Sequence, residues 1–243
     1  IPKIIAHRGA SHDAPENTLS SVTEGFQQRA DGVEVDIRMT RDGHIICHHD
    51  KSALRTTSVD KTIRSMSLSE IKKLDSGSWF GKEWVNEKVP QLEEILSSLP
   101  RQKEIFIEVK TKKEIVDSLL RLLRKGLLNL NQVTVISFFP EVIKEIKERE
   151  SKLKCNFLVA FEFKDLEVNE IVDTALSINA DGVGAQNHKN FNLSLVDSLR
   201  EENKTSHVWT VDEVDEARRY VEMGVESITT NRPLFLRSEL ERF

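Results

Sequence analysis

The chain has 243 residues, with 40 acidic against 35 basic side chains and a formal net charge of −5. This balance argues against a general nucleic-acid-binding protein, which needs a basic face. A domain of this length buries about 70–75% of its unfolded surface and needs no disulfides, so we expect Cys47 and Cys155 to be buried thiols.

The chain also lacks a membrane-targeting pattern. No apolar run approaches the roughly 18 residues that a membrane-spanning helix requires, and no signal peptide is visible. We therefore expect a cytoplasmic protein without a transmembrane segment, although a leader removed before residue 1 would leave the same sequence. The sequence does not indicate an oligomeric state.

Apolar runs of strand length recur along the chain, at residues 3–6, 33–39, 105–109, 133–137, 157–161, 181–185, 206–211 and 226–230. Helical spacing of apolar residues lies between most of them, at residues 17–29, 113–127, 140–149, 168–178, 192–202, 212–223 and 232–240. This alternation predicts a parallel sheet covered by helices. The number of units and the chain length favour a single (β/α)8 TIM barrel over 1–243; an open doubly wound sheet is the alternative.

One unit breaks the alternation. Arg41-Asp42-Gly43 is typical of a hairpin turn and precedes a second apolar run, from His44 to His48. Residues 51–100 then contain only short helical pieces, at 68–74 and 91–98. We therefore predict an insertion at approximately 51–100, on the end of the barrel where the strands finish and binding sites form.

Charged residues alternate with apolar residues in the expected strand at 33–39. Val33, Val35 and Ile37 would face the helices, which turns Glu34 and Asp36 into the barrel together with Arg38. Two like charges that face inward need a compensating cation.

The next expected strand repeats the pattern, with Phe106, Glu108 and Lys110 on its inward face. Glu34, Asp36 and Glu108 would then converge near the barrel mouth. Oxygen ligands without a cysteine suit Mg²⁺ or Ca²⁺. The pattern favours one divalent cation held by these carboxylates; the alternative is solvated charge with a salt bridge to Lys110.

Histidines stand where expected strands end. His7 follows the first strand, and His48 and His49 follow the run after the second, where only one of the two can face the site. A histidine moves protons near neutral pH, and Arg8 could hold a phosphate oxygen. The remaining histidines, His12, His44, His188 and His207, are expected to be structural or at the surface. His207 shares a strand face with Trp209 and would point inward.

Together these residues form an ordered series of motifs along most of the chain, namely His7-Arg8-Gly9, Pro15-Glu16-Asn17-Thr18, Glu34-Val35-Asp36, Thr40-Arg41-Asp42-Gly43, His49-Asp50, Arg55-Thr56-Thr57, Gly77-Ser78-Trp79-Phe80, Val89-Pro90-Gln91-Leu92-Glu93-Glu94, Glu108-Val109-Lys110, Ser137-Phe138 and Trp209-Thr210-Val211. The series resembles the glycerophosphodiester phosphodiesterase family. The resemblance implies a (β/α)8 barrel with an insertion after strand 2. It also implies metal-dependent hydrolysis of a small-molecule glycerophosphodiester to glycerol 3-phosphate and an alcohol, through a cyclic phosphate.

The resemblance also implies a role for each matching residue. It selects His49 over His48, because His49 precedes Asp50. The implied roles are acid/base catalysis by His7 and His49, ligation of one Mg²⁺ or Ca²⁺ by Glu34, Asp36 and Glu108, phosphate binding by Arg8 and Lys110, bracing of the site by Glu16 and Asn17, and an aromatic lining from Phe138 and Trp209.

Two positions depart from the family pattern. Asp212 follows Trp209-Thr210-Val211 where the family often has Asn, and Asn231 lies in Thr230-Asn231-Arg232-Pro233 where the family often has Asp. We expect these departures to affect the support of the last strand and substrate preference. We expect neither residue to touch the metal or the histidines.

Two other functions use the same barrel. A lysophospholipase D-like or sphingomyelinase D-like enzyme would act on lipids and needs an apolar rim or a basic membrane face; only Trp79, Phe80 and Trp84 offer a small aromatic cluster. A non-catalytic phosphodiester-binding barrel could lose a ligand or a histidine, whereas every expected position is present.

Overall fold

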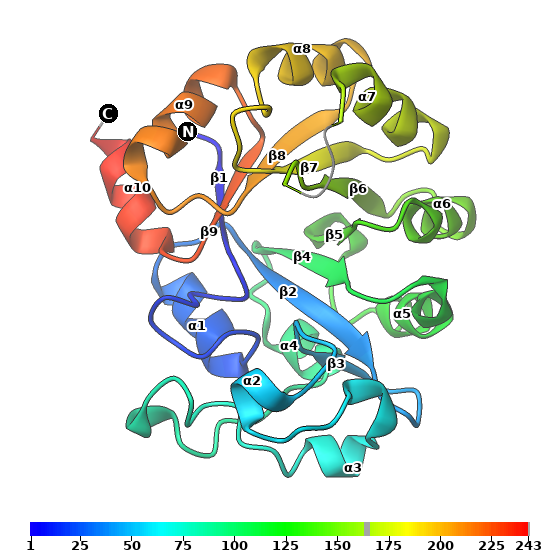
Figure 1. The fold of residues 1–243 in the computed structure, drawn as a ribbon, viewed down its shortest axis with the longest axis vertical. Coiled ribbons are helices and arrows are strands. Elements are labelled where there is room, and N and C mark those ends of the chain that lie inside the picture. The colour runs from blue at the N-terminus through cyan, green and yellow to red at the C-terminus, as the bar shows by residue number, and fades with distance from the viewer. Residues whose placement is uncertain (163–165, 243) are drawn as a thin grey trace.

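The computed structural model describes residues 1–162 and 166–242, and shows a closed barrel with helices on its outside (Figure 1). Eight parallel strands form the barrel, and pairing of the first with the second closes it. They are β1 (Lys3–Ala6), β2 (Gly32–Met39), β4 (Glu104–Val109), β5 (Val133–Ser137), β6 (Lys154–Val159), β7 (Gly182–Gln186), β8 (Thr205–Trp209) and β9 (Ser227–Thr230). The predicted (β/α)8 barrel is confirmed, and the open sheet is wrong.

Helices follow the strands and pack on the outer face of the sheet. They are α1 (Leu19–Gln27), α4 (Leu92–Ser98), α5 (Val116–Leu123), α6 (Pro140–Arg149), α7 (Val168–Ser177), α8 (Leu193–Glu201), α9 (Val214–Met223) and α10 (Pro233–Glu241). The apolar faces are those that helical spacing predicts; α5, for example, buries Val116, Leu119, Leu120 and Leu123. Thr18 caps α1 by accepting a hydrogen bond from the Ser21 amide.

The strand β6 begins earlier than the apolar run at 157–161 suggests. It spans Lys154–Val159 because its pairing with β5 starts at Lys154. Asn156 is buried and lines the barrel interior, so a polar residue occupies an inward position of this strand. The polar residue interrupts the apolar pattern, so the apolar run misplaces the start of this strand.

The segment between β2 and β4 forms a separate small layer, drawn in cyan below β2 in Figure 1. We call it the layer after β3, because most of it follows that strand. It contains β3 (Ile45–Cys47), which pairs antiparallel with β2, followed by α2 (Leu54–Thr57), η1 (Ile63–Ser65), α3 (Leu68–Ile71) and η2 (Lys82–Trp84). A small core of its own holds it together: Ile46, Ala53, Ile63, Met66, Ile71, Leu74 and Val89. Leu92 and Ile95 of α4, by contrast, belong to the main barrel core.

Two further observations concern the chain as a whole. Cys47 and Cys155 are both free and buried. Within the described ranges, no helix combines the length and apolar character needed to cross a lipid bilayer.

Candidate active site

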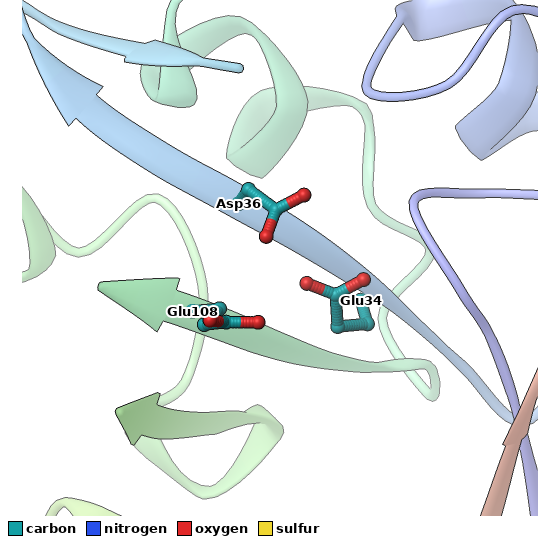
Figure 2. A group of neighbouring side chains, drawn as sticks. All are labelled: Glu34, Asp36 and Glu108. Carbon is teal, nitrogen blue, oxygen red and sulfur yellow. The ribbon is translucent and has the colours of Figure 1, made fainter. Parts of the chain in front are cut away.

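Three buried carboxylates meet inside the barrel, two along β2 and one near the carboxyl end of β4 (Figure 2). Glu34 and Asp36 come from β2, and Glu108 pairs with Asp36 across the parallel register. One oxygen atom from each of the three lies within 4.8 Å of the others. Val33, Val35 and Ile37 pack in the helix-covered core, so strand alternation positions the acids inside the barrel.

Two cations compensate part of this charge. The Arg8 Nε lies 3.2 Å from Asp36 Oδ2, and the Lys110 Nζ lies 2.6 Å from Glu108 Oε1 and 3.5 Å from Asp36 Oδ1. Asn17 adds two hydrogen bonds to Asp36, since its Nδ2 donates to the carboxylate and its Oδ1 accepts from the backbone N–H. Three carboxylates therefore face two cations.

The pKa values reflect this imbalance. Burial alone would raise the pKa of Asp36, but Arg8 and Lys110 outweigh it and hold that pKa well below its usual value. Burial and the neighbouring acids raise the pKa of Glu34 well above its usual range. Burial, followed by the charge of Asp36, raises the pKa of Glu108 to about 7. The site thus lacks positive charge.

The residues present fit a divalent cation. Glu34 Oε1 and Asp36 Oδ1 are buried and have no hydrogen-bond partner among the residues that the structure describes. An unpartnered buried carboxylate oxygen is costly, and a hard cation with oxygen ligands would satisfy both atoms. Glu34, Asp36 and Glu108 are the residues that could hold it.

His7 stands at the end of β1 and is held from behind. Its backbone N–H donates to the Thr230 carbonyl, and its Nδ1 lies 2.7 Å from Asn231 Oδ1. The Asn231 Nδ2 donates to Asp212 Oδ2 at 2.6 Å, so the amide oxygen must face the histidine. His7 therefore donates through Nδ1–H, and its Nε2 lies 4.0 Å from Glu34 Oε2. Burial, and next the charge of Arg8, lowers the pKa of His7 to about 4.

The expectation that Asp212 and Asn231 stay clear of the histidines is wrong. Asn231 contacts His7 directly, and Asp212 orients Asn231 through both its backbone N–H and its side chain. Asp212 also accepts a hydrogen bond from the Thr230 hydroxyl, so it does brace the end of β9. The sequence does not reveal the contact of Asn231 with His7, because barrel closure joins residues that lie far apart in the chain.

His49 approaches from the layer after β3 and has a different partner. Its Nδ1 lies 2.6 Å from Asp50 Oδ1, and Asp50 Oδ2 accepts from Arg55 Nε at 2.7 Å. Burial lowers the pKa of His49, although the nearby Asp36 charge opposes that shift. His48 is buried and turns its Nε2 to the Ser52 carbonyl instead.

A chain of ion pairs joins this layer to the loop after β1. Arg55 binds both oxygens of Glu16 at 2.7 and 2.8 Å, and Glu16 Oε1 also lies 3.0 Å from Arg8 Nη1. Glu16 therefore links Arg55 to Arg8. Sequence reasoning assigned no role to Asp50 or Arg55, although the adjacent His49-Asp50 pair was the available signal.

The loop after β1 turns sharply to bring Arg8 over the carboxylates. Arg8 has φ of 55° and Gly9 has φ of 78°, both in the left-handed region. A Cβ atom on Gly9 would lie 2.4 Å from the Ser21 backbone, so only glycine fits there. The backbone N–H of Arg8 then donates to Glu34 Oε2.

Aromatic side chains line the interior next to the acids. The rings of Phe138 and Trp209 meet edge to face with centroids 5.5 Å apart, and Lys110 Nζ lies 5.9 Å from the Phe138 centroid. Trp209 shares a narrow cavity with His7, Glu34 and Glu108. The structure thus gathers the residues selected from the sequence at one end of the barrel.

Comparison with known proteins agrees with this geometry. The sequence profile described as "Glycerophosphoryl diester phosphodiesterase family" matches residues 7–234. The chain is 29% identical over 237 residues to a glycerophosphodiester phosphodiesterase from Caldanaerobacter subterraneus subsp. tengcongensis, covering 95% of this chain and 94% of that protein. It is 31% identical over 247 residues to one from Bacillus subtilis, covering 94% and 83%.

Solved structures share the fold. A phosphodiesterase from Oleispira antarctica, in complex with the product sn-glycerol-3-phosphate, superposes with a TM-score of 0.89 at 24% identity, covering 99% of this chain and 97% of that chain. A glycerophosphodiester phosphodiesterase from Agrobacterium tumefaciens gives a TM-score of 0.84 at 24% identity, covering 98% and 100%.

Proposed function

This chain belongs to the glycerophosphoryl diester phosphodiesterase family, and we propose that His7 and His49 hydrolyse its substrate beside one divalent cation. The protein is a phosphoric diester hydrolase that converts glycerophosphodiesters to glycerol 3-phosphate and an alcohol. The observation that carries the proposed mechanism is the buried acidic cluster with unpartnered oxygens on Glu34 and Asp36.

Glu34, Asp36 and Glu108 would hold the cation, which when bound supplies the positive charge that neutralises a phosphodiester. The set of oxygen donors suits Mg²⁺ and Ca²⁺ alike. Arg8 and Lys110 flank the same carboxylates and are positioned to hold the phosphate oxygens. Asn17 keeps Asp36 in place through its paired hydrogen bonds.

The two histidines differ in the partner of Nδ1, and this difference supports the following roles in the first step. Because His7 donates Nδ1–H to an amide oxygen, its Nε2 carries a lone pair and takes the proton of the glycerol 2-hydroxyl. Because His49 faces the Asp50 carboxylate, it is the better holder of a second proton and gives one to the departing alcohol.

The reaction then proceeds in two steps. The glycerol 2-oxygen bonds to phosphorus while the bond from phosphorus to the alcohol oxygen breaks, which leaves a cyclic phosphate. Water next opens the ring with the histidine roles reversed, since His49 now takes a proton from water and His7 returns its proton to the 2-oxygen. Trp209 and Phe138 border the space beside the acids and would limit the access of water.

The test is release of glycerol 3-phosphate from small glycerophosphodiesters by metal-loaded protein. We expect release to disappear after chelation, to return with Mg²⁺ or Ca²⁺, and to fall in the His49→Ala variant. A substrate that lacks the 2-hydroxyl should not be cleaved, and cleavage of it at full rate would remove the cyclic intermediate. No release by protein that holds metal would favour a non-catalytic barrel.

A lipid substrate is a second candidate, because apolar side chains are exposed on the layer that also carries His49. Leu54 is 50% exposed and Trp79 is 40% exposed, and Trp79 packs edge to face on Phe80. Activity on micellar lysophosphatidylcholine well above that on glycerophosphocholine would favour this candidate. The expected cytoplasmic location stays a prediction, which cell fractionation would test.

A further inference from the structure

A second cavity opens beside the acidic cluster, between the ends of β2 and β4 and the layer after β3. It has a volume of about 400 Å³. Its charged lining residues are mostly basic, and its apolar lining residues are Met39, Ile63 and Phe139. The charged residues that line it are Arg38, Lys51, Arg64, Lys110, Lys112 and Glu114. We call this cavity the basic groove.

Strand alternation makes the basic groove continuous with the site. Arg38 follows Asp36 on the inward face of β2, and Lys110 follows Glu108 at the end of β4. Each step of two residues moves about 7 Å towards the mouth. Lys110 belongs to both places, because it lines the groove and its Nζ contacts Glu108 and Asp36.

The cations of the groove are largely without acidic partners. Arg38 is buried at 8% exposure, and among the residues that the structure describes its guanidinium donates only to the carbonyl oxygens of His49 and Lys110. Arg64 donates to the Thr40 carbonyl. Within the described part of the chain, none of Arg38, Lys51, Arg64 and Lys112 forms an ion pair with a carboxylate, a local excess of positive charge in a chain whose net charge is −5.

We propose that the basic groove binds the alcohol portion of the substrate, and that this alcohol carries a second phosphate. This inference rests on the function proposed above. Arg8 and Lys110 serve the phosphodiester itself, and glycerol is neutral, so the remaining cations of the groove suit a negative charge on the other substituent. Arg64 and Lys112 supply donors at the groove wall, while Ile63 and Phe139 accept the carbon skeleton.

The same charges act against a cationic headgroup. A quaternary ammonium in the groove would meet Arg38, Lys51, Arg64 and Lys112, and Glu114 is the one acid among the described residues that line it. A like charge at that distance lowers affinity, and the low dielectric around buried Arg38 strengthens the effect. Glycerophosphocholine is therefore a poorer substrate than an anionic diester.

The experiment compares two substrates that differ by one phosphate, glycerophosphoinositol and glycerophosphoinositol 4-phosphate. The readout is the ratio of their kcat/KM values in metal-loaded protein. We expect the ratio to favour the phosphorylated compound by tenfold or more and to decrease with added salt. The variants Arg64→Ala and Lys112→Ala should each lower the ratio by roughly threefold, and together by roughly tenfold, chiefly through KM.

Two further variants act as controls. Lys113→Ala removes an exposed cation next to Lys112 that does not line the groove, so it should leave the ratio unchanged. Glu114→Gln removes the acid of the groove and should raise the ratio. All these side chains are exposed, and equal melting temperatures will show that each variant is folded.

The outcomes separate this inference from the proposed function. Hydrolysis of both compounds at equal kcat/KM, or a ratio that Arg64→Ala and Lys112→Ala leave unchanged, would overturn the basic groove as a phosphate subsite and leave the hydrolase intact. Hydrolysis of neither compound would overturn the proposed mechanism together with this inference.

Discussion

The inward-facing side chains at the two ends of the barrel differ in how completely their polar atoms are paired. At the floor, His207 is buried with Nδ1 at 2.7 Å from the Ser227 hydroxyl and Nε2 at 2.8 Å from the Thr205 hydroxyl. At the mouth, Arg8 Nε, Glu34 Oε1 and Asp36 Oδ1 are buried without hydrogen-bond partners in the described residues.

The same strands build both ends. On β4, Phe106 packs against His207 at the floor, and Glu108 follows on the same face towards the mouth. At the floor, a His207 ring paired at both nitrogens stabilises the barrel. The charged, incompletely paired mouth gains stability when a ligand completes it. Among the described inward-facing side chains, buried polar atoms without partners therefore mark the functional end of this barrel.

The largest difference should be catalytic. His49→Ala, at the mouth, should lower kcat by roughly 10²–10⁴-fold, because a proton carrier is lost. His207→Gln, at the floor, should leave kcat within a few-fold of the original. Steady-state rates on one glycerophosphodiester measure both. If His207→Gln is as inactive as His49→Ala, the mouth is not the only catalytic end of the barrel.

The floor should instead affect the free energy of unfolding at acidic pH. Burial lowers the pKa of His207 to about 4 from a usual value of 6.5. Because the unfolded state binds more protons between those values, stability is retained above pH 6.5 and decreases as the pH falls towards 4. The loss contributed by His207 should approach about 3 kcal/mol at the lower limit.

Urea unfolding of metal-loaded protein from pH 7 down to 4.5 measures this loss. His207→Gln should flatten the decline relative to the original chain. His12→Gln is the matched control, because its side chain is 54% exposed. Equal slopes for the His207 and His12 variants would contradict the assignment.

A divalent cation should stabilise the mouth specifically. At a concentration one hundred times its Kd, a bound ion adds about 2.7 kcal/mol to the free energy of unfolding. The pKa of Glu108 is raised to about 7 by burial and by Asp36, so the metal-free protein loses stability as pH rises from 4.5 towards 7. The gain on adding metal should therefore be larger at pH 8 than at pH 5.

Thermal unfolding with and without Mg²⁺ or Ca²⁺ measures that gain. Glu34→Gln should nearly abolish it, because the amide cannot give the ion a negative ligand. The fold should stay intact, since the cluster already raises the pKa of Glu34 and the amide has the shape of the carboxyl group. A full metal response in Glu34→Gln would place the ion elsewhere.

The smallest effect should come from the residue behind His7. Asn231→Ala removes the acceptor of the Nδ1–H bond and should lower kcat roughly tenfold, with KM little changed. Asn231→Asp should also be harmful, because it sets a carboxylate against Asp212. Adding Asp212→Asn to that variant should restore most of the activity, and failure to do so would argue against a positioning role.

Much of this site could be predicted from the sequence, because the period of a β-strand is simple. Alternation alone turned Glu34, Asp36 and Glu108 inward, and burial of Val33 and Val35 on the other face bears this out. The choice of His49 over His48 came from the neighbouring Asp50, which indeed contacts it.

Other features depend on contacts that no local pattern encodes. Asn231 reaches His7 only because β9 pairs with β1 when the barrel closes. The bridge from Arg55 to Glu16 joins two loops whose approach depends on the layer after β3. The approach of Lys110 to Asp36 is likewise fixed by the register of β2 against β4, and that of Arg8 to Asp36 by the pairing of β1 with β2.

The separate small core beneath His49 has a consequence for how the protein loses activity on heating. Ile46, Ile63, Met66 and their neighbours hold this layer, apart from the larger barrel core. Such a unit can open by local unfolding at lower free energy than the whole domain. It carries His49, Lys51 and Arg64, so one sub-global opening removes a proton carrier and one wall of the basic groove. We expect inactivation to precede melting, with early hydrogen exchange confined to this layer.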